Sequence, residues 1–139
     1  MKKTFAVIDG NSLLFRAFYA LPLLEAEKGV YTNAVYGFLS MLFKMIDQYR
    51  PTHVAVAFDT REPTFRHKAF DAYKAGRKET PQELLDQFDL MRRVLDALGI
   101  RHYELPGYEA DDILGTIAKR VQAQGDEALL ITGTAIPFS

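Results

Sequence analysis

The chain has 139 residues, of which 48% are apolar and 25% are charged, and these values are typical of one globular domain with a hydrophobic core. It contains no cysteine, so disulfides, thiolate metal ligands and a cysteine nucleophile are excluded. No apolar run is long enough to span a membrane, and the stretch that follows the N-terminal lysines is too short for a signal peptide. These features predict a cytoplasmic protein with no membrane partner.

The formal net charge of −1 conceals an uneven distribution of charge. Between Arg61 and Lys78 the chain has six basic and two acidic residues, a local charge of +4. The remainder of the chain therefore carries a net charge of −5. Such a segment is typical either of a polyanion-binding surface or of a solvated helix face, and its charge alone does not separate the two.

Strand-like and helix-like patterns alternate along the chain. The strand-like runs are short and mostly apolar, whereas the helical runs repeat their apolar residues every three or four positions. This alternation predicts an α/β fold with a mostly parallel central sheet flanked by helices. In chain order the predicted elements are strand Thr4–Asp9, helix Asn33–Tyr49, strand His53–Asp59, helix Pro81–Leu98, strand Arg101–Leu105, helix Glu109–Gln124 and strand Ala128–Thr132.

Capping signals mark the ends of several helices. The run Thr80-Pro81-Gln82-Glu83 predicts a capping box, and Gly99 predicts the end of the same helix. Asn11 and Ser12 are predicted to cap a helix that follows the first strand, and thereby to orient Asp9.

Five carboxylates lie at or just after the ends of predicted strands. In an open parallel sheet these ends meet at one edge, where ligands gather. Charges roughly 4 Å apart repel by about 4 kcal/mol at an effective dielectric of 20, so such a cluster favours a neutralising cation. Hard oxygen ligands select Mg²⁺ or Mn²⁺. Taken singly, each of these residues is also common in a turn or in the first turn of a helix. Both a metal site and a purely structural role therefore remain open for them. The five are Asp9, Asp59, Glu109, Asp111 and Asp112.

Several sequence blocks, taken in order, resemble the 5′-nuclease domain of bacterial DNA polymerase I. Each block is short, but together they cover residues 4 to 133. The blocks are Asp9–Ser12 with Arg16–Pro22, Thr32–Phe38, Pro51–Asp59, Pro63–His67 with Tyr73–Arg77, and Gly107–Asp112.

This resemblance implies a three-layer fold like that of flap endonucleases and PIN domains. It also implies a structure-specific 5′-3′ nuclease of replication and repair that uses divalent metals to hydrolyse DNA at 5′ ends or flaps. By position, Asp9, Asp59, Glu109 and Asp111 resemble ligands of the first metal, and Asp112 resembles a neighbour in the same cluster.

The basic segment, at about residues 61–80, resembles the gateway through which a 5′ end passes. Lys74 and Arg77 are the predicted catalytic cations, because phosphodiester cleavage builds negative charge on the phosphoryl group. Tyr73 is predicted to stack on a base, although packing against the body of the domain fits it equally well. The predicted DNA contacts are Arg66, His67, Tyr73, Lys74, Arg77 and Lys78.

The chain departs from the family pattern after Gly133. The family continues with two aspartates that hold the second metal, where this chain has Thr134 and Ile136. Residues 134–139 form a divergent tail, and the downstream helix-hairpin-helix part is absent. We therefore expect one weakly held Mg²⁺ or Mn²⁺, slow cleavage, and self-association through the apolar tail. A non-catalytic DNA-binding fragment and a PIN-type ribonuclease remain as alternatives, and the family suggests a polymerase domain in a parent protein.

Overall fold

The protein is seen here as a computed structural model, which describes residues 2–59, 80–104 and 110–132, with only the backbone described at position 111. Its central sheet has four parallel strands in the order β5-β4-β1-β6. The strands are β1 (Thr4–Asp9), β4 (His53–Ala57), β5 (Arg101–Tyr103) and β6 (Glu127–Ile131). The predicted parallel sheet is confirmed, and its strands end within two residues of their predicted bounds.

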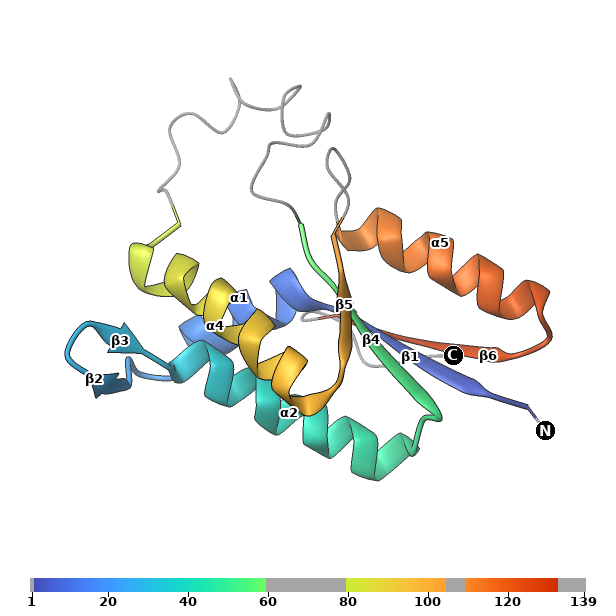
Figure 1. Cartoon of the computed structure of the whole chain (residues 1–139), viewed down its shortest axis with the longest axis horizontal. Helices are drawn as coiled ribbons and strands as arrows, with labels where there is room; N and C mark the ends of the chain where they lie inside the picture. The colour runs from blue at the N-terminus through green and yellow to red at the C-terminus, as the bar shows by residue number, and fades with distance from the viewer. Residues whose placement is uncertain (1, 60–79, 105–109, 133–139) are drawn as a thin grey trace, which may run out of the picture.

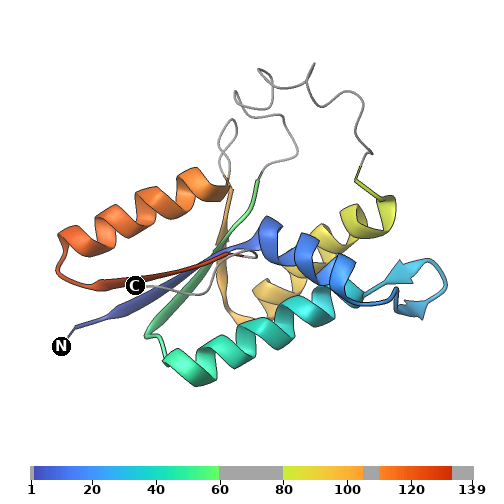
Figure 2. The ribbon, with the colours of Figure 1, turned by 180° about the vertical axis from the view of Figure 1, so that it is seen from behind.

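Helices cover both faces of the sheet and make a three-layer arrangement (Figures 1 and 2). Helices α1 (Gly10–Ala20), α2 (Asn33–Tyr49) and α4 (Gln82–Leu98) lie on one face, and α5 (Ala110–Ala123) lies on the other. None of the described helices is both long and apolar enough to cross a membrane. The predicted α/β class and three-layer architecture are confirmed.

The alternation of side chains along the strands explains the two apolar layers. In β1, Ala6 and Ile8 join the large core beneath α1, α2 and α4, whereas Val7 faces α5. In the same way Val56 joins the large core, while Ala57 faces α5. This alternation therefore fixes the face of the sheet on which the last residue of each strand lies.

A small antiparallel hairpin was not predicted. It consists of β2 (Glu25–Glu27) and β3 (Val30–Tyr31) and turns at Gly29, whose φ is 83°. Its residues are almost all exposed and carry no apolar alternation, so the sequence offers no periodic signal for it.

The predicted capping box at the start of α4 is wrong. The N-cap residue is Pro81, which makes no side-chain capping bond, and its carbonyl accepts the N–H groups of Leu84 and Leu85. The predicted end at Gly99 is confirmed, because Gly99 adopts a left-handed conformation with φ 74°.

Two buried amide side chains join α1, α2 and α4. The Gln87 Oε1 accepts the backbone N–H groups of Ala34 and Val35 at 2.7 and 3.1 Å, so a side chain of α4 caps α2. Gln87 Nε2 donates to Asn33 Oδ1 at 2.9 Å, and Asn33 Nδ2 donates to the Phe18 carbonyl at 3.0 Å. Both amides are fully buried, so these bonds form away from competing water.

We predict that Gln87→Leu lowers the free energy of unfolding by about 2 kcal/mol or more, because it leaves buried N–H groups of α2 without an acceptor. The matched control is Gln82→Leu on the same helix, where the side chain is exposed and bonds only to Asp86 among described residues. This control is expected to change stability by less than about 0.5 kcal/mol. Urea unfolding measures both, and equal losses in the two variants would contradict the capping role.

Candidate functional site

The strand order changes direction beside the end of β1. From β1 the chain adds β4 and then β5 on one side, and it returns through α5 to add β6 on the other. The direction of strand addition therefore reverses at β1. Open α/β sheets bind ligands outside the carboxyl ends of their strands at such a point. Asp9 is the last residue of β1 and lies at this edge.

Asp9 is a buried carboxylate held by the first turn of α1. It is the N-cap residue of that helix, and the residue is only 5% exposed. Its Oδ1 accepts the Ser12 N–H at 3.1 Å, and its Oδ2 accepts the Ser12 hydroxyl at 2.8 Å. The predicted orientation of Asp9 by Ser12 is confirmed. The expected cap formed by Asn11 and Ser12 is wrong, because Asp9 itself caps the helix.

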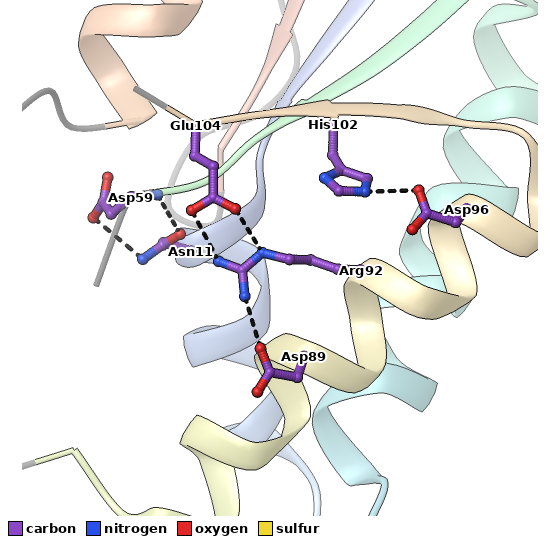
Figure 3. Close-up of polar contacts among 7 residues, drawn as sticks. All are labelled: Asn11, Asp59, Asp89, Arg92, Asp96, His102 and Glu104. Carbon is purple, nitrogen blue, oxygen red and sulfur yellow. Dashed lines mark hydrogen bonds and ion pairs between the residues drawn. The ribbon is translucent and has the colours of Figure 1, made fainter. Parts of the chain in front are cut away.

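Asn11 instead bonds to Asp59, which follows the neighbouring strand β4 (Figure 3). The Asn11 Oδ1 accepts the Asp59 N–H at 2.9 Å, and its Nδ2 donates to Asp59 Oδ2 at 3.2 Å. The other carboxylate oxygen of Asp59 accepts the backbone N–H of Ala110, the first residue of α5. Asp59 therefore lies at the positive end of the α5 dipole and joins three elements.

The remaining predicted metal ligands are only partly described. Asp112 is in the first turn of α5, and the backbone of Asp111 precedes it. Glu109 and the side chain of Asp111 lie outside the described residues. Among the described side chains, no group of three or more acidic or histidine residues is close enough to hold a metal ion. The convergence of all five carboxylates therefore stays a prediction.

The gateway residues also lie outside the described part of the chain, which has a gap from 60 to 79. The same holds for positions 134 and 136 of the tail. The predicted roles of the gateway residues therefore stay predictions, and these residues are Arg66, His67, Tyr73, Lys74, Arg77 and Lys78.

An arginine that sequence reasoning missed lies close to this edge (Figure 3). The Arg92 Nε of α4 is 3.0 Å from Glu104 Oε1, and its Nη1 is 3.3 Å from Asp89 Oδ1. The guanidinium carbon also lies 5.0 Å from the centre of the Phe58 ring. Arg92 thus ties the end of β5 to α4 beside the residue that precedes Asp59. Its position in an amphipathic helix gave no signal of this role.

The sequence matches a known family of nuclease domains and part of several DNA polymerases. The family model described as "5'-3' exonuclease, N-terminal resolvase-like domain" matches residues 4–134. DNA polymerase I of Bacillus caldotenax is 54% identical to the chain over 133 residues, and that of Bacillus subtilis is 52% identical over 132 residues. These matches cover 96% and 95% of this chain but only 15% of each polymerase.

Solved structures share the fold. A zinc-bound bacteriophage T5 5′-exonuclease superposes with a TM-score of 0.63 at 21% identity, covering 94% of this chain and 49% of that one. A T5 flap endonuclease in complex with DNA and metal ions gives a TM-score of 0.61, also at 21% identity, covering 94% and 48%. At these identities the likeness shows a common fold.

Gly10, between Asp9 and Asn11, leaves no room for a side chain. A Cβ at this position would lie 2.5 Å from Phe58 Cε1 and 2.9 Å from Val56 Cγ1. The absence of a side chain thus lets the start of α1 lie against β4, which brings Asn11 to Asp59.

We predict that Gly10→Ala destabilises the fold by about 1–3 kcal/mol, because the new methyl group overpacks the core against Phe58. Gly115→Ala is the matched control, since a Cβ at this exposed position of α5 would meet no atom within 4 Å in the described structure. That control is expected to stabilise the protein by about 0.5–1 kcal/mol, the usual gain over glycine in a helix. Chemical denaturation measures both, and a Gly10→Ala variant as stable as the parent would refute the close approach.

Proposed function

Because the chain belongs to the family of 5′-3′ exonuclease N-terminal resolvase-like domains, we propose that it hydrolyses DNA phosphodiester bonds near 5′ ends or flaps. The observation that supports this proposal is that Asp9 and Asp59 both lie at the carboxyl edge of the sheet, where Asp59 accepts the backbone N–H of Ala110 at the start of α5. Asp9 ends β1, and Asp59 follows the adjacent strand β4 by two residues. Both carboxylates are fixed by hydrogen bonds before any substrate arrives.

The donor chemistry of this edge fits Mg²⁺ or Mn²⁺. Carboxylate oxygens are the ligands that these hard cations prefer, and the chain has no cysteine to favour a softer metal. We propose Asp9, Asp59, Glu109 and Asp111 as ligands, with Asp112 beside them. When bound, a divalent cation would supply Lewis-acid polarisation of the phosphodiester and a nucleophilic water. One T5 structure is described with bound zinc and another with metal ions, which supports a metal site in this fold.

The hydrogen bonds of Asp9 and Asp59 would fix the directions of their carboxylates. Ser12 holds both oxygens of Asp9, while Asn11 and Ala110 each hold one oxygen of Asp59. A carboxylate oxygen can accept more than one partner, so these bonds do not by themselves exclude a cation. A preorganised pair of anions costs little reorganisation when the reaction begins.

The basic segment would hold the DNA. In the sequence it follows Asp59 closely, and Asp59 lies at the carboxyl edge of the sheet. We propose that Lys74 and Arg77 stabilise negative charge on the phosphoryl group, while neighbouring basic residues neutralise phosphates of the 5′ end. The residues proposed for DNA contact are Arg66, His67, Tyr73, Lys74, Arg77 and Lys78.

The divergent tail, residues 134–139, favours slow cleavage. Thr134 and Ile136 stand where the resemblance places the two aspartates of a second metal, so we propose that the chain holds one Mg²⁺ or Mn²⁺ weakly. The apolar residues at 136–138 are proposed to promote self-association. The chain spans 15% of its polymerase relatives, which supports a parent protein with a polymerase domain that acts on the bacterial chromosome in the cytoplasm.

The competing functions differ in substrate or in catalysis. The 44–54% identity to DNA polymerases I supports a DNA nuclease over a PIN-type ribonuclease. A fragment that binds DNA without cleaving it is supported by the absence of aspartate at 134 and 136. Whether the chain cleaves DNA therefore distinguishes a nuclease from a fragment that only binds DNA.

We predict that the purified chain cleaves a labelled 5′-flap DNA slowly in Mn²⁺, and that Asp59→Asn lowers the rate by roughly a hundredfold or more, because it removes a negative charge from the metal site. The matched control is Asp126→Asn, where the carboxylate is near the opposite end of the sheet and accepts the Lys3 N–H at 3.1 Å. That control should cleave at the parental rate. No cleavage by the folded parental chain would favour the DNA-binding fragment, and cleavage unaffected by Asp59→Asn would refute the site.

A further inference from the structure

The Asn11–Asp59 pair joins two segments that are 48 residues apart in the chain. One amide side chain contacts both the backbone N–H and the carboxylate of the same residue, at 2.9 and 3.2 Å. Both residues are partly shielded from solvent. A two-point contact of this kind fixes the main chain and the side-chain direction together, which a single bond does not.

The place of Asn11 follows from the end of β1. The strand ladder between β1 and β4 has its last pair at Asp9 and Ala57, after which β1 turns into α1. On its other side β4 continues its bonding to β5, because the Phe58 N–H donates to the Tyr103 carbonyl at 2.9 Å. The Asp59 N–H has no strand neighbour on the β1 side, and Asn11 Oδ1 supplies the acceptor there. The side chain of Asn11 thus extends the ladder by one bond.

We infer that Asn11 is a positioning residue for the metal site, acting through Asp59; this inference rests on the proposed function. Asn11 Nδ2 and the Ala110 N–H each donate to a different oxygen of the Asp59 carboxylate, from α1 and from α5. The carboxylate plane is therefore held from two sides. Ligands that are oriented in this way bind metals more tightly, because less rotational freedom is lost when the cation arrives.

If Asn11 had only a structural role, its loss would lower stability without specifically weakening metal binding. Thr52 provides a matched comparison. Thr52, immediately before β4, joins the amino-terminal ends of the same two strands. Its hydroxyl donates to the Thr4 carbonyl at 2.9 Å and accepts the Thr4 N–H at 2.9 Å. The side chains of Asn11 and Thr52 thus each join β1 or its continuation to β4 by two bonds, but only Asn11 contacts a proposed ligand.

The test measures Mn²⁺ binding to the 139-residue chain by electron paramagnetic resonance of the free ion, together with the melting temperature without metal. Asn11→Ala is expected to raise the dissociation constant for Mn²⁺ about tenfold, whereas Thr52→Val changes it by less than about twofold. Both variants should lower the metal-free melting temperature. If Asn11→Ala does not fold, Asn11→Ser replaces it, because serine keeps one polar atom in the first turn and is expected to weaken binding about threefold.

Three results would overturn the inference. Unchanged Mn²⁺ affinity in the Asn11 variant would show that the contact does not position a ligand. Equal weakening in the Asn11 and Thr52 variants would show that affinity follows stability alone. A parental chain that binds no Mn²⁺ would refute the proposed metal site itself, and the positioning role with it. The affinity of the parental chain therefore separates failure of the inference from failure of the proposed function.

Discussion

The hydrogen bonds of Asp59 are the constraint on which the candidate site depends. They connect the end of β4 to the first turn of α1 through Asn11 and to the first residue of α5 through Ala110. The two helices lie on opposite faces of the sheet, so one carboxylate joins all three layers at the carboxyl edge (Figures 1 and 2). A metal ligand that also holds the fold together would link the geometry of the site to the stability of the domain.

Close packing and buried hydrogen bonds also stabilise the carboxyl edge of the sheet. Gly10 lets α1 approach Phe58, and the Arg92 guanidinium carbon lies 5.0 Å from the centre of the same ring. Farther from the edge, the Asn33–Gln87 pair fixes how α1, α2 and α4 meet. Because these contacts are made within the chain, the positions of Asp9 and Asp59 are set by the fold before a ligand binds.

Much of the fold was predictable because its signals are local. A short apolar run and helical spacing predict the bounds of β1 and α2 as the structure has them, and the order of elements predicts the parallel sheet. The hairpin β2–β3 was not predicted because its residues are almost all exposed and show no apolar alternation. Asn11 was assigned to a cap because its neighbours favour one, but its partner lies 48 residues away. Sequence spacing carries no information on such a pair, and the same is true of Arg92 and Glu104.

The central claim is that a divalent cation binds at the carboxyl edge of the sheet. The most direct test records amide resonances of the labelled chain by nuclear magnetic resonance while Mn²⁺ is added in small amounts, since a paramagnetic ion broadens only nearby signals. We expect the signals of Gly10, Asp59 and Ala110 to broaden first, while those of His53 and Glu127, at the amino ends of β4 and β6, stay sharp. Broadening that begins at the amino ends, or is uniform over the sheet, would contradict the claim.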